Sequence, residues 1–216
     1  MTDRLSRDVP LRPTEAALLF IDVQNFSATP EGGEWKGMDP AALESECGYY
    51  FDRLRTVAVP NMQKLAAACR HAGIEVLYTV IESLTLDGRD RSLDYKITGF
   101  NVPKGSWDAR VIDEIAPQGD EIVLPKTSSS VFISTNIDYL LRNLGVRYLV
   151  LCGMLTDQCV ESAVRDACDL GYLVTLVPDA CATMDQARHD NTLRAIKGYC
   201  RQRKTDELIA EIKGLR

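Results

Sequence analysis

A cysteine lies at the junction between an apolar run and an amphipathic pattern in the stretch Arg147–Gly171. The apolar run, residues 148–152, is too short for a core helix and is bounded by Gly153, so it predicts a buried strand. Residues 160–167 carry apolar side chains at the spacing of a helix face. Cys159 then falls in the first turn of this helix, where unpaired N–H groups and the helix dipole favour a thiolate and can hold an oxyanion. This placement is typical of a nucleophile.

A structural role is the alternative for any cysteine in this chain. The sequence contains 7 cysteines, and a free cysteine is among the most buried residue types in proteins. Cys152 lies within the apolar run, while Cys69 and Cys168 fall on helical patterns, so packing explains these three. Cys159 differs because it follows a glycine-containing turn, but its position alone leaves both interpretations open.

Two charged residues follow other apolar runs in the same way. Asp22 comes directly after residues 17–21, and Lys126 comes two residues after residues 121–124. By itself Asp22 is more often a cap or turn residue, and a lone lysine is more often solvated. However, the carboxyl ends of parallel strands meet at one edge of a sheet, where α/β proteins bind ligands. We therefore expect Asp22, Lys126 and Cys159 to converge in one cleft.

The elements that must position these residues alternate between strand and helix along the chain. Apolar runs predict strands at 17–21, 74–81, 121–124, 148–152 and 172–177, with a short edge strand within 199–203. Helical patterns separate them, without internal repeats or a linker. This order predicts an α/β fold: a single-domain, doubly wound parallel sheet flanked by helices on both faces. Residues 1–14 are interpreted as an N-terminal arm and residues 15–216 as the domain.

Several local expectations complete this picture. Pro60 is expected in the first turn of a helix that ends at Gly73. Ser106 is expected to cap a helix that carries Val111, Ile112 and Ile115. Residues 178–181 predict a turn after the fifth strand. His189 is expected at the surface, on an early turn of a helix over residues 186–197.

Two long connections are candidates for the wall of the site. Residues 24–56 are long for a strand-to-helix connection, which favours a lid or an interface segment, although an ordinary surface excursion explains them equally well. Residues 82–104 are polar and loop-like. Within the first segment, Asn25, Phe26 and Trp35 are predicted substrate contacts.

Composition and charge argue against several other classes of function. A net charge of −6 and a pI near 5.0 disfavour nucleic acid and anionic membranes as partners. The first residues are polar and no run approaches a membrane span. An odd number of cysteines without a CxxC pair predicts reduced thiols in the cytoplasm. With only 2 histidines, we expect no metal site and no Ser-His-Asp triad.

Three segments together resemble the isochorismatase-like cysteine hydrolases. They are LLFIDVQNFS around Asp22, VLPKTSSSVF around Lys126 and LVLCGMLTDQCVESAVRDACDLGY around Cys159, and the likeness runs from Ala17 to about Ile196. The resemblance implies a Rossmann-like fold, an Asp-Lys-Cys catalytic triad at these three positions, and no cofactor. It further implies a cis peptide at Met154–Leu155 and an oxyanion hole built from the backbone N–H groups of Leu155 and Cys159.

Departures from parts of this family narrow the expected reaction. The Asp-x-His-x-x-His metal cluster of nicotinamidases does not occur before Lys126, and the cysteine that true isochorismatases typically lack is present. Residues 104–108 and 122–126 look like the corresponding stretches of ureidoacrylate amidohydrolases. The resemblance therefore implies a cysteine amidohydrolase for non-peptide C–N bonds, acting through a thioester-type intermediate. We expect a small linear amide or ureide with a carboxylate or another polar tail, and a homodimer or homotetramer.

Two other functions remain open at the level of the sequence. One is isochorismatase-type hydrolysis of a vinyl ether, which would release pyruvate. The other is a non-catalytic or redox-sensing relative in which Cys159 is merely oxidised, although a sensor needs no paired aspartate and lysine.

Overall fold

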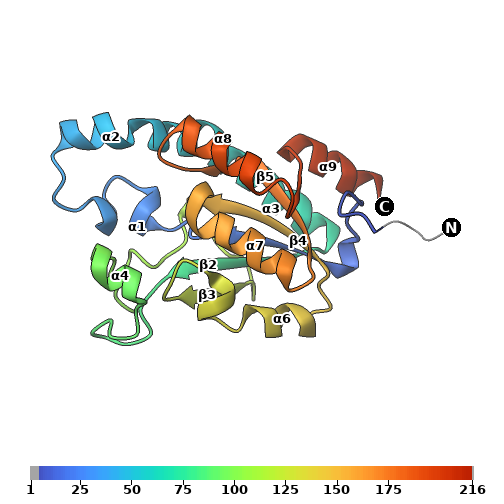
Figure 1. The fold of residues 1–216 in the computed structure, drawn as a ribbon, viewed down its shortest axis with the longest axis horizontal. Helices are drawn as coiled ribbons and strands as arrows, with labels where there is room; N and C mark the ends of the chain where they lie inside the picture. The colour runs from blue at the N-terminus through green and yellow to red at the C-terminus, as the bar shows by residue number, and fades with distance from the viewer. Residues whose placement is uncertain (1–4, 216) are drawn as a thin grey trace.

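Six parallel strands form one sheet in the order β3-β2-β1-β4-β5-β6 in a computed structural model that describes residues 5–215 (Figure 1). The strands are β1 Ala16–Ile21, β2 Glu75–Ile81, β3 Ile122–Lys126, β4 Tyr148–Met154, β5 Leu173–Ala182 and β6 Arg201–Gln202. Every residue of the central strands β1 and β4 is buried, as expected for parallel strands covered on both faces. The predicted parallel sheet is confirmed.

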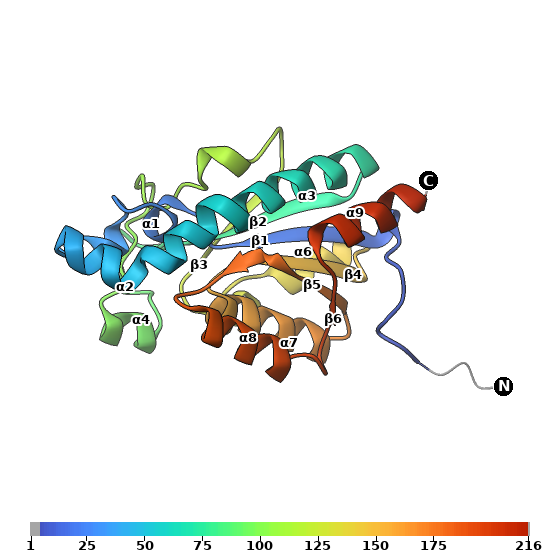
Figure 2. The ribbon, with the colours of Figure 1, turned by 90° about the horizontal axis from the view of Figure 1, so that it is seen from above.

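Helices cover both faces of this sheet. They are α1 Asn25–Ala28, α2 Pro40–Arg53, α3 Val59–Ala72, α4 Leu93–Thr98, α5 Val131–Ser134, α6 Ile137–Asn143, α7 Glu161–Asp169, α8 Gln186–Ala195 and α9 Thr205–Gly214. Short 3-10 turns occur at Pro13–Glu15, Gly33–Trp35 and Asp113–Ile115, and π-helical turns at Leu54–Ala58 and Thr156–Val160. Figure 2 shows α3 and α9 on one face and α7 and α8 on the other, which confirms the doubly wound arrangement.

The strand order reverses between β1 and β4. From β1 the chain moves outward through β2 to β3, and it then returns to β4 and moves the other way through β5 to β6. Ligands of open α/β sheets bind outside the carboxyl ends of the strands at such a switch point. Helices α1 and α4 lie beyond this end of the sheet (Figure 1). The fold thus marks the crevice between the ends of β1 and β4.

The connection 24–56 is more regular than its sequence indicates. It contains α1, a 3-10 turn and the 14-residue helix α2, which continues into α3 through the π-helical turn Leu54–Ala58. Pro60 lies in the first turn of α3, as predicted, and α3 ends at Gly73, although the π-helical turn joins α3 to α2 without a break. In the π-helical turn the Val59 N–H reaches back to the Leu54 carbonyl. This wider turn relieves the crowding that proline causes inside a regular helix.

Three expectations about local secondary structure were wrong. Residues 82–104 contain helix α4, capped by the Ser92 hydroxyl, which accepts from the Tyr95 N–H. The helix expected after Ser106 is replaced by turns and the 3-10 turn Asp113–Ile115, because Val111 forms an antiparallel bridge with Gln24. Residues 178–181 belong to β5, which shifts register against β4 near Gly153. Proline is tolerated in β5 because β6 pairs only with its first half.

The predicted N-terminal arm is described from residue 5 onward, and residues 1–4 of that prediction lie outside the described residues. Residues 5–12 form no regular element, although Leu11 is buried and its N–H bonds to Glu211. Across residues 5–215 no helix combines the length and apolar character needed to cross a bilayer. All 7 cysteines are free thiols in this structure, and six of them are buried.

Candidate active site

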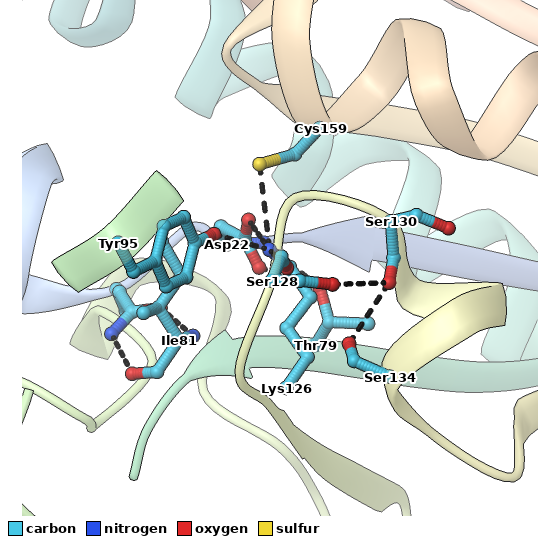
Figure 3. Close-up of polar contacts among 10 residues, drawn as sticks. Asp22, Thr79, Ile81, Tyr95, Lys126, Ser128, Ser130, Ser134 and Cys159 are labelled. Atoms are coloured by element: carbon cyan, nitrogen blue, oxygen red, sulfur yellow. Dashed lines mark hydrogen bonds and ion pairs between the residues drawn. The ribbon is translucent and has the colours of Figure 1, made fainter. Parts of the chain in front are cut away.

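Asp22, Lys126 and Cys159 meet at the carboxyl edge of the sheet (Figure 3). The Lys126 Nζ lies 2.8 Å from the Asp22 Oδ2 and donates a hydrogen bond to the Cys159 Sγ over 3.4 Å. All three are buried, with 0% of Lys126, 2% of Asp22 and 6% of Cys159 exposed to solvent. A carboxylate, an ammonium group and a thiol, which come from the ends of three different strands, therefore meet at one site that is almost inaccessible to solvent.

Both the backbone and the side chain of Asp22 are held by hydrogen bonds to Thr79. Its φ of 56° places this residue in the left-handed region, which aspartate tolerates better than most residues. The Asp22 N–H donates to the Thr79 carbonyl over 3.1 Å, and the Thr79 hydroxyl donates to Asp22 Oδ1 over 2.8 Å. This bend turns the chain at the end of β1 and fixes the carboxylate toward Lys126.

The Lys126 ammonium has further partners besides Asp22. It donates to the Ser128 carbonyl over 2.8 Å and to the Tyr95 hydroxyl over 3.2 Å. Burial alone lowers the pKa of this lysine, but the negative charge of Asp22 and its hydrogen bond with Lys126 oppose burial, and the pKa is raised above its ordinary value. Lys126 is therefore a permanent cation at neutral pH.

The thiol of Cys159 differs electrostatically from the sequence-based expectation. Burial raises its pKa to about 12; the Lys126 charge opposes this effect, and the Asp22 charge adds to it. The expectation that the helix N-terminus leaves Cys159 as a thiolate was wrong, because desolvation outweighs the neighbouring positive charges. In addition, the helix begins with the π-helical turn Thr156–Val160 rather than a regular α-turn. The resting nucleophile is a neutral thiol beside a carboxylate.

The strand-to-helix turn before Cys159 has an unusual backbone. The Met154–Leu155 peptide is cis, as the resemblance implies, and Leu155 and Cys159 both line the same cavity. Gly153 has a φ of 132°, and a Cβ at this position would lie 2.2 Å from the Ile21 carbonyl oxygen. Only glycine lets β4 approach the end of β1 so closely. Leu155 and Cys159, whose N–H groups are the proposed oxyanion donors, therefore share a cavity wall with Asp22.

His189 supports the same turn from behind, so its predicted surface position was wrong. It is 3% exposed, and its Nδ1 lies 2.9 Å from the Thr156 hydroxyl. Its Nε2 lies 2.9 Å from the Arg53 Nη2. Because arginine can only donate, Nε2 must accept, and the ring proton resides on Nδ1. Burial first, and then the Arg53 charge, lower the His189 pKa to about 4, so the ring is neutral.

A cavity of about 590 Å³ has Asp22 and Cys159 in its wall, a size suited to a small ligand. The three predicted substrate contacts, Asn25, Phe26 and Trp35, are not among the residues that line this cavity. Asn25 donates to the Trp107 carbonyl, Phe26 packs in a small apolar cluster, and Trp35 donates to the Ser27 carbonyl. Their chain neighbours Ser27 and Glu34 line the cavity.

Four residues that bear on the site carry no motif that reveals them in the sequence. Thr79 and Tyr95 bond to Asp22 and Lys126, and Glu34 lines the cavity. Gln24 is fully buried, and its amide bonds to both the N–H and the carbonyl of Ile81. The sequence offered one signal for Gln24: it lies two residues after Asp22, close to the end of a buried strand, where an amide side chain needs hydrogen-bond partners.

Metal binding has no obvious set of ligands here. Within residues 5–215, no group of three or more His, Cys, Asp or Glu side chains is arranged to hold a metal ion.

Comparison with known proteins gives one consistent family. A family model for the isochorismatase domain matches residues 16–205. Ureidoacrylate amidohydrolase RutB of Rhizobium rhizogenes is 32% identical over 194 residues, covering 80% of this chain and 72% of that protein. Its counterpart in Agrobacterium fabrum is 31% identical over 198 residues, covering 80% and 78%.

Solved structures show the same relationship. A cysteine hydrolase from Pseudomonas syringae pv. phaseolicola superposes with a TM-score of 0.82 and 25% identity over 100% of both chains. N-carbamoylsarcosine amidase from Thermoplasma acidophilum superposes with a TM-score of 0.67 and 28% identity, covering 89% of this chain and 98% of that one. The matched domain, residues 16–205, contains Asp22, Lys126 and Cys159.

Proposed function

The chain belongs to the isochorismatase family of hydrolases, and we propose that it cleaves the C–N bond of a small linear amide or ureide through a covalent intermediate on Cys159. The observation that carries this proposal is the contact of Lys126 with both Asp22 and Cys159 at the cavity wall. The names of two relatives, a ureidoacrylate amidohydrolase and an N-carbamoylsarcosine amidase, support a C–N bond as the target.

In the first half of the reaction, Asp22 takes the proton of the Cys159 thiol as the sulfur attacks the carbonyl carbon. Because the pKa of the buried thiol is raised to about 12, proton transfer must accompany the attack rather than precede it. The carbonyl oxygen becomes an oxyanion, for which the N–H groups of Leu155 and Cys159 are the proposed donors. Asp22 then passes the proton to the departing nitrogen, and ammonia or an amine leaves.

In the second half, water enters where the amine left. Asp22 removes a proton from the water, the hydroxide adds to the thioester or thiocarbamate carbon, and the C–S bond breaks. The sulfur regains the proton from Asp22, which restores the starting thiol. Throughout, Lys126 holds the Asp22 side chain in place, since its ammonium lies 2.8 Å from Asp22 Oδ2.

The test is an ammonia-release screen over small amides, ureides and carbamoyl amino acids, followed by Cys159→Ala and Cys159→Ser. We expect Cys159→Ala to abolish turnover with the fold unchanged by circular dichroism, and Cys159→Ser to retain at most a trace. Mass spectrometry of enzyme quenched during turnover should show an acyl or carbamoyl adduct on the peptide that contains Cys159.

Two results would contradict the proposed function. Comparable turnover by Cys159→Ala would exclude covalent catalysis, and pyruvate release from an isochorismate-like acid would then indicate vinyl-ether hydrolysis led by Asp22. Failure of the whole panel, together with reversible modification of Cys159 by peroxide, would indicate a redox-sensing role.

A further inference from the structure

The charges around the cavity are strongly one-sided. Among the residues that the structure describes, its wall contains one cationic side chain, Arg165, and five carboxyl side chains: Asp22, Glu34, Asp94, Asp157 and Glu161. A substrate tail therefore meets a mostly acidic wall.

Three of these carboxylates already have a cation. Asp22 pairs with Lys126 at 2.8 Å and Asp157 with Arg188 at 2.6 Å. Glu161 accepts from both Nε and Nη2 of Arg165, which also stacks 4.7 Å from the Tyr199 ring. The one cationic side chain in the wall is thus already bonded to a carboxylate, which makes it a poor receptor for a second one.

Glu34 and Asp94 are the two carboxyl groups of the cavity wall that have no cationic partner among the described residues. Neither forms an ion pair with any residue of the described part of the chain, 5–215. Asp94 is exposed in the first turn of α4, whereas Glu34 is only partly exposed. Burial raises the pKa of Glu34 to about 7, as expected for a carboxyl group without a counter-charge.

The backbone around Glu34 is fixed on both sides. The Gly33 N–H donates to Asp108 Oδ1 over 3.2 Å, and the Trp35 indole N–H donates to the Ser27 carbonyl over 3.1 Å. Trp35 is also buried, with its ring 5.9 Å from that of Tyr50. The Glu34 side chain is therefore presented to the cavity by a rigid segment rather than by a mobile loop.

We infer that this cavity selects substrates whose tail carries a cation, such as an ammonium, amidinium or guanidinium group, and that Glu34 and Asp94 are its specificity-determining residues. The inference rests on the proposed function for the position of the scissile bond. It distinguishes this chain from relatives named for ureidoacrylate, whose tail is a carboxylate. The sequence analysis expected a substrate tail with either a carboxylate or another polar group, and this inference disfavours the carboxylate.

The test uses three ureas of nearly equal size and different charge: (2-aminoethyl)urea, propylurea and 3-ureidopropionate. Their binding to the Cys159→Ala protein is measured by calorimetry at neutral pH, so no turnover is needed. We expect the cationic urea to bind about tenfold more tightly than the neutral one, and the anionic urea to bind most weakly. Glu34→Gln should lower the affinity for the cationic urea about tenfold and change that for propylurea less than about twofold.

A matched control separates a local contact from a general loss of charge. Glu31→Gln makes the same substitution three residues away, in an exposed side chain that does not line this cavity, and should change none of the affinities. Asp94→Asn, on a different element, provides a second variant if Glu34→Gln does not fold, and it should also weaken binding of the cationic urea.

Each remaining outcome overturns the inference. These outcomes are equal or tighter binding of 3-ureidopropionate, no measurable binding of (2-aminoethyl)urea at millimolar concentration, or unchanged binding of the cationic urea in the folded variants. The proposed function fails separately. If the cationic urea binds but no amide or ureide releases ammonia, the charge preference stands without the hydrolysis. If carboxylate-bearing ureides are the good substrates, the hydrolysis stands without the charge preference.

Discussion

The Lys126 ammonium balances a carboxylate that has almost no contact with water. If Lys126 is replaced by Met, the Asp22 charge is left buried with only the Thr79 hydroxyl and other neutral partners. Removing one partner of a buried ion pair costs about 3–5 kcal/mol, far more than the pair itself contributes. We therefore expect Lys126→Met to lower the free energy of unfolding by about that amount in urea titrations near neutral pH.

Two further variants show whether the stranded charge is the cause. In Asp22→Asn/Lys126→Met both charges are gone, and much of the lost stability should return. Arg142→Met breaks the surface pair with Asp138, whose side chains are 56% and 35% exposed, and should cost less than about 1 kcal/mol. An equal loss in the single and double variants would instead assign the effect to packing.

The protonation of Cys159 predicts how it reacts with a simple alkylating reagent. Only the thiolate is nucleophilic, and burial raises the pKa of this thiol to about 12. The rate of alkylation by iodoacetamide should therefore rise about tenfold per pH unit between about pH 6 and about pH 9, without a plateau. The rate is followed by mass spectrometry of the peptide containing Cys159. A plateau near neutral pH would mean that Lys126 already holds a thiolate.

At the scale of elements, the approach of β4 to β1 depends on a single missing side chain. A Cβ at Gly153 would lie 2.2 Å from the Ile21 carbonyl oxygen and 2.7 Å from its nitrogen, and both are backbone atoms that cannot move aside. Gly153→Ala should cost about 3 kcal/mol or more in unfolding free energy and most of the activity. Gly145→Ala is the matched control, because its φ of 72° is also positive but no atom lies within 4 Å, so only about 1 kcal/mol should be lost. Equal losses would show that the close approach is unimportant.

The contact between α8 and the turn before Cys159 predicts a dependence of stability on pH. The folded protein keeps His189 neutral with a pKa of about 4, against about 6.5 in an unfolded chain. As the pH falls below about 6.5, the unfolded state takes up the proton first, so stability decreases until about pH 4. We expect this residue alone to remove about 1–2 kcal/mol between about pH 7.5 and about pH 5, measured by urea unfolding.

His189→Gln isolates that contribution from the other titrating groups. The glutamine oxygen can accept from Arg53 and its amide can donate to Thr156, so the two contacts can persist without a titrating ring. The variant should lose less stability than the wild type over the same pH interval. An identical decrease in both proteins would show that His189 does not titrate differently on folding.

The strands, rather than the helices, made this fold predictable from its sequence. An apolar run in a parallel sheet is buried on both faces, so β1 and β4 stand out by composition alone. Helix α4 has six residues and depends on the cap at Ser92, a signal too local to separate it from the surrounding polar loop. Pro60 and Gly73 marked the first turn and the end of α3 correctly, but the π-helical turn that joins α3 to α2 has no signal in the sequence.

The candidate site was predictable for the same reason. Asp22, Lys126 and Cys159 were found because each follows a recognisable strand, and parallel strands place their carboxyl ends together. Glu34 and His189 could not be found this way. Glu34 reaches the cavity through a 3-10 turn held by contacts to distant residues, and His189 is buried by the packing of α8 on the turn before Cys159.

At the scale of the whole molecule, the topology of the sheet and the distribution of charge both determine the properties of the same cavity. The switch between β1 and β4 positions the crevice, and the loops and helices beyond it supply the acidic wall. The chain as a whole carries a net charge of −6, which has the same sign as the excess of carboxyl groups in the cavity wall. The predicted homodimer or homotetramer stays a prediction and would superimpose further charge of this sign.

This agreement between the local and the overall charge predicts a specific response to salt. Salt screens exposed charges over about 8 Å at physiological ionic strength and over shorter distances as salt rises, so it weakens the attraction of a negative cavity for a cation. Raising sodium chloride from about 0.05 M to about 0.5 M should therefore weaken binding of (2-aminoethyl)urea to the Cys159→Ala protein by several-fold. Propylurea, which has no charge, should be nearly unaffected and corrects for general effects of salt. For 3-ureidopropionate the response should reverse, because salt screens the repulsion. If all three ureas respond alike, the acidic wall does not contribute to selection, whatever reaction Cys159 performs.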